Sequence, residues 1–380
     1  MDTLQLLAKI TNKLAIKYFT YRILKFLLNA NTPSKRSNRF DLRNIYNELN
    51  AFSPDPKTSC ICNNHITQKK QWDLQIIVPV YNVELYIKEC IESLIKQQTK
   101  YKYQIIIVND GSLDKSRKIL CQYEGRDNVL IIDQENKGFS GARNRALENI
   151  DAHYIMFVDS DDKLNQNAIE ILMDKAFSIN ADIVEGGYHY FTGDKITKTR
   201  QSLYEDNNPR HLHGTPWAKV YKSNLFKSIH FPEKYWFEDT LNNIIIFPQI
   251  TKTTIVSDIV YYYRVHPQGI SQKSKGAAKT LDTYYITCSL LNDRIKMGYP
   301  HTKLLYENVI LQIYINARRI NTLNNPQIER AIFYLTASFI KDYFKDLKQY
   351  VNIGNYQIDE MAKALQKQNF IAYKLAYLFL

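Results

Sequence analysis

Short apolar runs that alternate with helical stretches constrain the fold of this chain more than any other feature of its sequence. Residues 74–80 are apolar at nearly every position, as expected of a strand that is buried on both faces. Similar runs at residues 103–109, 129–132, 154–159 and 181–186 are separated by stretches of helical character. Alternating strands and helices predict an α/β fold, in which a mostly parallel sheet is flanked by helices.

The two ends of the chain differ from this middle part. A short helix is expected over residues 41–52, followed by a breaker cluster at residues 53–56. After about residue 280 the periodicity is helical throughout. We therefore predict three parts: a basic helical N-terminal extension with a linker over residues 1–72, an α/β domain over residues 73–275, and a helical C-terminal domain over residues 276–380.

The net charge of +12 is concentrated in the two flanks. Residues 1–72 carry 12 Lys and Arg against 4 Asp and Glu, and residues 276–380 carry 13 against 8. The middle part is close to neutral, with 25 basic against 26 acidic residues. Basic flanks favour an anionic partner, either a membrane surface or a polyanion, while a solvated basic surface without a partner is an equal alternative.

The first 28 residues contain a helical stripe of apolar side chains. These recur at spacings of three and four, and they are Leu7, Ile10, Leu14, Tyr18, Tyr21, Leu24 and Leu28. Lysines at positions 9, 13 and 17 form a second row, which is typical of a helix that lies in a membrane interface. A helix that docks on its own protein or on a partner chain would show the same stripe and is an equal alternative. No run of 18 residues is free of charge, so no transmembrane helix is predicted.

Several chemistries are excluded by motifs that the chain lacks. It contains no P-loop, no G-x-G-x-x-G after a strand, no H-E-x-x-H and no G-x-S-x-G. Its five cysteines are too sparse for a disulfide framework, which favours a reducing compartment. Cys60, Cys62 and His65 do not suggest a zinc site, because four ligands are needed and no second pair exists.

Polar side chains gather where the predicted strands end. Ligands of open α/β sheets bind outside the carboxyl ends of the strands, so these positions are the ones to inspect. The run that ends near residue 159 is followed by three carboxylates, those of Asp159, Asp161 and Asp162. Carboxylates held this close raise one another's pKa, and a divalent cation such as Mg²⁺ or Mn²⁺ would relieve the repulsion. The alternative is a solvated turn in which an aspartate caps a helix.

The segments at residues 76–82, 108–112, 136–144 and 157–162 together resemble the family 2 glycosyltransferases of bacterial cell-surface polysaccharide synthesis. The resemblance continues through Pro216-Trp217-Ala218-Lys219, Phe237-Glu238-Asp239-Thr240 and Tyr262-Tyr263-Arg264, and it covers residues 73–275. It implies an inverting enzyme with the GT-A fold, a Rossmann-like α/β architecture. The flanks, residues 1–72 and 276–380, take no part in it.

The resemblance also implies a role for individual residues. Asp159 and Asp161 form a D-x-D pair, and with His266 they would hold Mn²⁺ or Mg²⁺. Asp239 would be the general base. The side chains implied to bind the donor are Pro79, Tyr81, Asp110, Asn136, Arg143, Asp159, Trp217, Lys219 and Arg264.

Some of these roles have a structural alternative. Arg143 would otherwise form an ordinary pair on its helix, and Trp217 would be a core aromatic residue. Glu238 and Asp239 would otherwise be acidic residues at a helix N-terminus. The segment around His266 matches the family least well, so its part in metal binding is the weakest of these expectations.

We therefore expect a metal-dependent hexosyltransferase that moves a sugar from a nucleotide-sugar donor, first of all a UDP-sugar, to a hydroxyl group of a glycan or lipid-linked acceptor. Such a transfer needs a cation to neutralise the leaving diphosphate and a carboxylate to accept the proton of the hydroxyl group. The expected location is the cytoplasm, as a peripheral protein on the inner face of the cell membrane. The sequence leaves the oligomeric state open, a homo-oligomer included, and nucleic acid is not an expected partner.

Two other classes of protein are alternatives. A sugar-phosphate nucleotidyltransferase would have a similar fold, but it would carry a Gly-rich basic loop where this chain has Val80-Tyr81-Asn82. A non-catalytic protein that binds a membrane or a polyanion through its basic flanks would not need the carboxylates at positions 159, 161 and 239.

Overall fold

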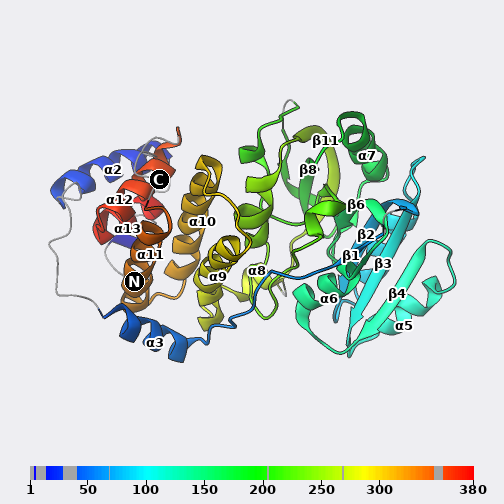
Figure 1. The fold of residues 1–380 in the computed structure, drawn as a ribbon, viewed down its shortest axis with the longest axis horizontal. Coiled ribbons are helices and arrows are strands. Elements are labelled where there is room, and N and C mark those ends of the chain that lie inside the picture. Colours follow the sequence, from blue (N-terminus) through cyan, green and yellow to red (C-terminus); the bar gives the residue numbers. More distant parts are fainter. Residues whose placement is uncertain are drawn as a thin grey trace. The chain divides into compact units, whose positions relative to one another are not determined.

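The structure, a computed structural model, describes residues 4–5, 14–28, 41–67, 69–202, 205–267, 269–345 and 354–380. The chain divides into two compact units. The sheet unit is Thr58–Gly269, and the helical unit combines Met1–Lys57 with Ile270–Leu380 (Figure 1). The sequence-based boundaries at residues 73 and 276 differ from this division, because residues 58–72 contact the sheet unit and the two flanks contact each other.

Within the described residues, nine strands of the sheet unit form one sheet in the order β4-β3-β2-β6-β10-β8-β11-β7, with β9 paired to β8. The strands are β2 (Trp72–Val80), β3 (Tyr103–Asp110), β4 (Val129–Gln134), β6 (Ala152–Phe157), β7 (Lys163–Leu164), β8 (Ile183–Thr192), β9 (Lys195–Arg200), β10 (Lys219–Lys222) and β11 (Thr253–Arg264). Strands β4, β3, β2 and β6 are parallel to one another, and so are β8 and β11. The α/β fold with a mostly parallel sheet is therefore confirmed.

Two of the strands that the apolar pattern did not predict, β9 and β10, make three of the pairings in this sheet. Strand β10 lies between β6 and β8 and is antiparallel to both. Strand β9 is antiparallel to β8, and every one of its residues is exposed. A strand of four residues and a strand with no buried face leave no continuous apolar run, so neither produces the signal that marks β2 or β3.

The helices of the sheet unit are α4 (Ile87–Ile95), α5 (Ser116–Leu120), α6 (Gly138–Leu147) and α7 (Ala168–Ile179). Ile76 and Val78 of β2 share one apolar core with Ile91 of α4 and Leu172 of α7. Helix α6 contacts β2 and β3. A short parallel pair, β1 (His65–Ile66) with β5 (Asn149–Ile150), joins the segment before β2 to the sheet unit.

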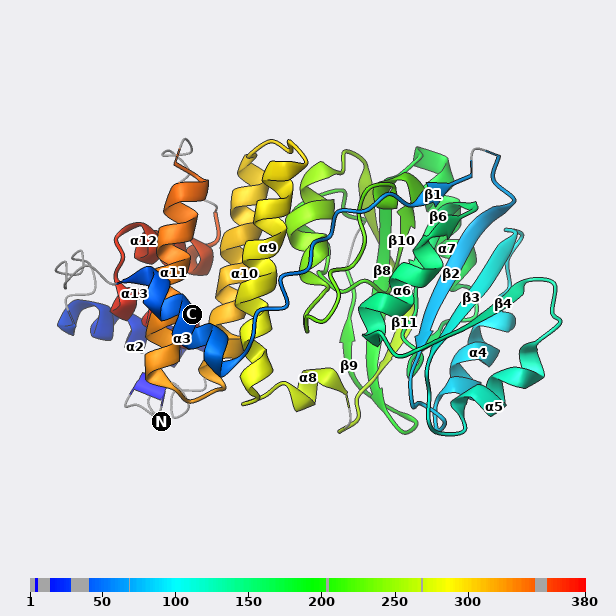
Figure 2. The same cartoon turned by 60° about the horizontal axis from the view of Figure 1, so that its bottom comes forward.

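The helical unit contains, among the described residues, α2 (Leu14–Leu27), α3 (Leu42–Phe52), α8 (Ile270–Lys273), α9 (Asp282–Lys296), α10 (Lys303–Asn321), α11 (Pro326–Tyr343), α12 (Tyr356–Gln366) and α13 (Phe370–Phe379) (Figure 2). Asparagine side chains at positions 325, 355 and 369 cap α11, α12 and α13 by accepting backbone N–H bonds. The helix expected over residues 41–52 and the helical C-terminal region are confirmed.

Helix α2 docks on its own protein through part of the predicted stripe. Tyr21 is 1% exposed, packs against Leu375 and Phe379 of α13, and donates its hydroxyl hydrogen to Glu360 of α12. Lys25 pairs with the same carboxylate. The stripe residues Leu7 and Ile10 lie outside the described residues. In the part of the chain that the structure describes, no helix is both long and apolar enough to cross a bilayer.

The opposite face of α2 carries large apolar side chains that are exposed. Phe19 is 67% exposed and Phe26 is 76% exposed, and Ile23 and Leu27 lie between them on the helix surface. Residues 19, 23 and 26 share one face because their spacings are four and three, and Leu27 extends this surface because it lies four residues after Ile23. The face of α2 opposite to Tyr21 is therefore exposed and apolar, while the part of the predicted stripe around Tyr21 is docked on the protein.

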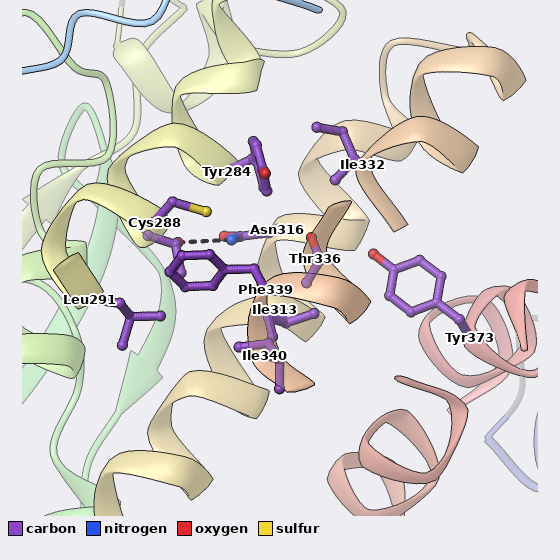
Figure 3. Close-up of a pocket in the computed structure, with 11 residues that line it drawn as sticks. Tyr284, Cys288, Leu291, Ile313, Asn316, Ile332, Thr336, Phe339, Ile340 and Tyr373 are labelled. Carbon is purple, nitrogen blue, oxygen red and sulfur yellow. Dashed lines mark hydrogen bonds between the residues drawn. The ribbon is translucent and has the colours of Figure 1, made fainter. Parts of the chain in front are cut away.

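A hollow in the helical unit lies between α9, α10, α11 and α13 (Figure 3). Tyr284 and Cys288 come from α9, Ile313 and Asn316 from α10, and Tyr373 from α13. The Asn316 amide donates a 3.0 Å hydrogen bond to the hydroxyl group of Thr287, also on α9. None of the described residues that line this hollow is an Asp, Glu, Lys or Arg.

Candidate active site

The loop after β6 carries the three predicted carboxylates, and one of them holds the loop in place. Asp162 is 1% exposed. It accepts a 2.7 Å hydrogen bond from the Tyr261 hydroxyl group and another of 2.7 Å from the Arg264 backbone N–H, both on β11. The same tyrosine oxygen accepts a 3.1 Å bond from the Asp159 backbone N–H. The end of β11 therefore fixes the loop, and Asp162 is its anchor.

Arg143 of α6 joins two acidic segments. Its guanidinium group, 3% exposed, lies 2.7 Å (Nη2 to Oδ1) from Asp159 and also pairs with Glu238 through Nη1. Phe231 lies under the guanidinium at 5.3 Å. Burial raises the pKa of Asp159, and Arg143 opposes that rise while the carboxylates of Asp161 and Asp239 add to it. Arg143 is thus a buried bridge, and not a pair on the helix surface.

Glu238 and Asp239 stand next to each other where the chain enters a helical turn. Burial raises the pKa of Glu238 to about 7, with Arg143 acting against the rise and Asp239 adding to it. Asp239 is half-buried, and its carbonyl accepts the N–H of Asn242, which begins a π-helical turn over Asn242–Ile246. Phe237 before them has φ 63°, which is unusual for a residue with a side chain. Strained backbone of this kind and π-turns both concentrate at functional sites.

Asp161 is bound to the segment after β11. Its Oδ2 lies 2.7 Å from Nε2 of His266, and its carbonyl accepts a 2.7 Å bond from Nε of Arg264. The other ring nitrogen of His266 is buried and has no hydrogen-bond partner. Arg264 also pairs with Glu89 of α4. The structure therefore brings Asp161, Arg264 and His266 together, as the sequence expected.

A divalent cation fits this arrangement only in part. No three His, Cys, Asp or Glu side chains among the described residues are gathered closely enough to hold a metal ion by themselves. Asp159, which the sequence assigned to the metal, is paired with Arg143. Asp161 and His266 remain adjacent, and Mg²⁺ typically takes one or two protein ligands and completes its shell with water and substrate phosphates. The three-ligand set is therefore not assembled, but a two-residue set is.

The carboxyl ends of β3 and β4 form a second polar group. Asp110 is 1% exposed, and its Oδ1 accepts bonds from the side chain of Gln134 (2.7 Å) and the backbone N–H of Lys137 (2.8 Å). Asn136 donates a 3.0 Å bond to the Asp110 carbonyl. Oδ2 of Asp110 and Oε1 of Gln134 are buried acceptors without a partner. Buried polar atoms are rarely left unpaired, so this pair of acceptors is suited to a ligand that donates hydrogen bonds.

Pro79 and Tyr81 flank the end of β2 beside this group. Pro79 is buried in the strand, where it pairs in register with Val108 of β3. Tyr81 follows the strand and is 46% exposed. Asn82 has φ 51° and accepts the Leu113 N–H at 2.7 Å, so the β2 turn is held to the loop after β3. Tyr81 follows Val80 and Asp110 follows its register partner Asn109, so both stand at the same edge of the sheet, where an exposed aromatic ring is a suitable surface for a planar base.

Lys219 and Trp217 are positioned differently from what the sequence implied. Lys219 is 0% exposed, and its ammonium lies 2.9 Å from Glu185 and donates to the carbonyls of His213, Thr215 and Trp217. With these four acceptors its three donors are fully used. Lys219 was expected to bind the donor, but in the structure its ammonium group is buried and holds the 213–217 loop instead. Trp217 is 5% exposed and stacks on Tyr261 at 4.8 Å, as a core aromatic residue would.

Comparison with known proteins identifies the family. The family model described as "Glycosyl transferase family 2" matches residues 75–236. The chain is 31% identical over 246 residues to glycosyltransferase GlyG of Streptococcus pneumoniae. The aligned region covers 59% of this chain and 81% of GlyG. The chain belongs to glycosyltransferase family 2.

Other family 2 relatives are matched over a smaller share of their length. Glycosyltransferase GlyA of S. pneumoniae is 33% identical over 254 residues, which is 61% of this chain but 36% of GlyA. Poly(ribitol-phosphate) β-N-acetylglucosaminyltransferase TarS of Staphylococcus aureus is 30% identical over 207 residues, 51% of this chain and 36% of TarS. The chain therefore spans only about a third of each of these two relatives.

A solved structure confirms the fold. TarS residues 1–349, crystallised with UDP-GlcNAc, superpose with a TM-score of 0.61 at 20% sequence identity. The match covers 80% of this chain and 89% of the TarS fragment. At this identity the likeness concerns the fold, which is the GT-A architecture expected from the sequence.

Sequence reasoning missed several residues that build this family 2 site. Gln134 is the last residue of β4, but the apolar run that predicted this strand stops at residue 132. The search for polar side chains at the strand end therefore did not reach Gln134. Tyr261 and Glu89 gave no signal, because they act across the fold: Tyr261 reaches Asp162 and Glu89 reaches Arg264. Asp162 was visible as the third carboxylate, but its role as the anchor of the loop depends on β11.

Proposed function

We propose that this chain is an inverting glycosyltransferase that moves a sugar from a nucleoside diphosphate sugar, first of all a UDP-sugar, to a hydroxyl group of a surface glycan or lipid-linked acceptor. The observation that carries the proposal is the convergence of Asp159, Asp161, Glu238 and Asp239 beside one buried arginine at the carboxyl edge of the sheet. Open α/β sheets bind their ligands at this edge.

The nucleobase would lie against Tyr81 and the unpaired acceptors of Asp110 and Gln134. Uracil presents an N–H group, and the ribose presents hydroxyl groups, so both can donate to these buried oxygens. The crystallised TarS complexes with UDP-GlcNAc and UDP are in keeping with a uridine nucleotide. Asn136 helps to hold the loop that carries these groups through its bond to the Asp110 carbonyl.

The diphosphate would lie near Asp161, His266 and Arg264. Asp161 and His266 would hold a divalent cation, Mn²⁺ or Mg²⁺, and a cation there neutralises charge on the leaving diphosphate. The two residues already lie 2.7 Å apart (Oδ2 to Nε2), and the other nitrogen of His266 is a buried atom without a partner. Arg264 is fixed by Glu89 and by the Asp161 carbonyl, so it contributes positive charge at a defined position.

Asp239 would accept the proton of the acceptor hydroxyl group as the new glycosidic bond forms. It is half-buried, and it lies close enough to Glu238 and Asp159 to raise the pKa of both. Arg143 holds those two neighbouring carboxylates and so compensates their charge. A single displacement on the face opposite the leaving group inverts the anomeric centre, so no covalent nucleophile is required.

The exposed face of α2 would place the enzyme on a membrane. Phe19, Ile23, Phe26 and Leu27 present apolar surface, and the helix Leu14–Leu27 carries three basic and no acidic residues. An amphipathic helix of this kind binds anionic lipid surfaces. A position at the inner face of the cell membrane would bring the enzyme to a lipid-linked acceptor.

The proposed activity is tested by UDP release from a panel of UDP-sugars, with Mn²⁺ and with EDTA. We expect slow, metal-dependent hydrolysis of one donor. Asp239→Asn should retain UDP affinity and lose turnover by about two to four orders of magnitude, as for loss of a general base. If the panel gives no hydrolysis and calorimetry detects no UDP binding with metal present, the proposed function is wrong.

A further inference from the structure

One face of the sheet beside the candidate active site combines aromatic and basic side chains. In the antiparallel hairpin β8–β9, Tyr188 lies opposite Arg200 and Tyr190 lies opposite Lys198. Cross-strand partners project to the same face, so these four side chains share one side of the hairpin. Strand β11 adds Tyr263, whose partner in register is Tyr190, to the same side. Figure 2 shows β8, β9 and β11 next to one another.

The aromatic side chains of this face form a row that begins at the aspartate loop. The Tyr261 hydroxyl group bonds Asp162. Trp217 stacks on Tyr261 at 4.8 Å and on Tyr263 at 5.2 Å, and Tyr263 meets Tyr190 edge-on at 5.4 Å. Tyr190 and Tyr263 are half-buried, so each leaves part of its ring accessible. The row therefore leads from the site of chemistry to an aromatic surface that a ligand can reach.

The basic side chains of this face lie on an edge strand that has no acidic residue. The sequence of β9 is Lys-Ile-Thr-Lys-Thr-Arg, with every residue exposed. Nζ of Lys198 lies 5.4 Å from the centre of the Tyr190 ring. We call Tyr190, Tyr263, Lys198 and Arg200 the β9 platform. A cluster of cations with no carboxylate in its strand gives a positive local potential, which attracts anions.

Arg200 acts electrostatically on two buried groups, those of Lys219 and His213. Burial lowers the pKa of Lys219; Arg200 adds to the lowering, while the carboxylates of Glu185 and Asp239 oppose it. Arg200 and Asp239 therefore both act on the same buried ammonium group. Arg200 also contributes to the low pKa of His213, together with burial. By position, Arg200 lies opposite Tyr188, and the Tyr188 ring meets Trp217 edge-on at 4.7 Å, so Arg200 stands beside the aromatic row that leads to the aspartate loop.

We propose that the β9 platform binds the acceptor, and that this acceptor is a chain bearing phosphodiester groups. The inference rests on the proposed function, because it names the substrate class that reaches Asp239. Guanidinium and ammonium groups bind phosphate oxygens through short, charge-assisted hydrogen bonds. Tyrosine rings offer an apolar body for the carbon skeleton of a sugar or polyol and a hydroxyl group for its polar substituents. A neutral glycan would make no use of the basic side chains.

The experiment measures binding of a synthetic glycerol-phosphate oligomer to the full chain, by calorimetry at low and physiological salt. We expect Lys198→Gln combined with Arg200→Gln to weaken binding at least about tenfold, as for lost hydrogen bonds to a charged group. The salt dependence of the dissociation constant should fall with the charges removed. Lys252→Gln is the matched control, since Lys252 is exposed and precedes the other end of β11. It should bind as the wild type does.

A second measurement separates this inference from the proposed function. UDP-sugar hydrolysis without an acceptor should be unchanged in the Lys198→Gln protein, while its KM for the glycerol-phosphate oligomer as acceptor should rise by the same factor as its dissociation constant. If no donor is hydrolysed by any variant, the proposed function is wrong. The calorimetry still shows whether the β9 platform binds the glycerol-phosphate oligomer.

Two results would overturn the inference. One is equal binding of the oligomer by the double variant and the wild type, in which case the cations only protect an exposed edge strand from pairing with another chain. The other is a loss of binding to anionic vesicles without any loss for the oligomer, which would assign the platform to lipid headgroups. Tyr190→Leu, at a half-buried position, should weaken oligomer binding without changing the salt dependence.

Discussion

At the scale of single residues, Arg143 decides how the site is held together. One guanidinium group connects α6, the loop after β6 and the segment before the π-helical turn through its pairs with Asp159 and Glu238. Only arginine can do this, because its planar fork presents donors in two directions while a lysine is a single point charge. The sequence assigned Arg143 to the donor; its burial favours a positioning role.

Arg143→Lys tests that role. We expect turnover to fall by about a hundredfold, because a displacement of about 1 Å between catalytic groups has effects of this size. The affinity for UDP should change by less than about threefold, since the side chains proposed to bind UDP do not include Arg143. The control is Arg145→Lys, which alters an exposed residue of the same helix that pairs with Glu148. A donor KM that rises while turnover stays unchanged would return Arg143 to donor binding.

His213 makes the sheet unit sensitive to acid. Burial, with Arg200 and Lys219 adding to it, lowers the pKa of its imidazole to about 2. The folded protein therefore keeps this ring neutral, while the unfolded chain protonates it below about pH 6.5. Stability is full above that pH and is lost as the pH falls, by about 1.4 kcal/mol per pH unit.

His213→Gln should remove this loss. We expect the free energy of unfolding of the wild type to fall more steeply than that of the variant between pH 6 and pH 4, as measured by urea unfolding at a series of pH values. Glutamine keeps a polar group beside Thr215, whose hydroxyl lies 2.9 Å from Nδ1. Parallel pH profiles for the two proteins would show that the ring is protonated in the folded state.

At the scale of secondary-structure elements, α2 has two apolar faces, one docked on the helical unit and one exposed. Tyr21 binds the helical unit through α12 and α13, and the face that carries Phe19 and Phe26 is exposed. Periodicity located the helix but left open whether its apolar stripe meets a membrane or the protein itself, and the structure docks Tyr21 of that stripe on the protein. Both faces are apolar, so only the position of the neighbouring helices separates them.

The membrane role of this face is tested with Phe19→Ser combined with Phe26→Ser. Each phenylalanine contributes about 1.5–3 kcal/mol when it leaves water, so binding to vesicles with anionic lipid should weaken at least tenfold, or about 1.4 kcal/mol. Urea unfolding should be unchanged, because both residues are exposed. Phe52→Ser on α3, where the ring is 46% exposed, is the control. Vesicle binding that is equal in all three proteins would rule out a membrane role for α2.

At the scale of the whole molecule, the two flanks of the chain form one helical unit, and the sheet unit is inserted between them in the sequence. Residues 58–72 belong to the sheet unit for physical reasons. Cys60 is 0% exposed, its carbonyl accepts the His230 N–H at 2.9 Å, and β1 pairs with β5. The family 2 match, which starts at residue 75, does not include this segment.

Two fragments test this division. We expect residues 58–269 to unfold cooperatively and to bind UDP, and residues 73–269 to be less stable by at least about 3 kcal/mol, because burial of apolar side chains and several backbone hydrogen bonds are lost. Urea unfolding followed by circular dichroism gives both values. Equal stability of the two fragments would show that the 58–72 segment is only an appendage of the sheet unit.

The sequence by itself determined the α/β class, the expected strands and the carboxylates at their ends, because burial on both faces leaves continuous apolar runs and the residues after them must lie at one edge. The tertiary structure alone decided the rest. It placed β9 and β10, whose sequences are too polar or too short to be predicted as strands. It also paired Lys219 with the buried Glu185, and Arg143 with the two carboxylates of Asp159 and Glu238. The partner of a buried charged side chain comes from a segment far away in the sequence, so a local sequence pattern does not predict which residues pair.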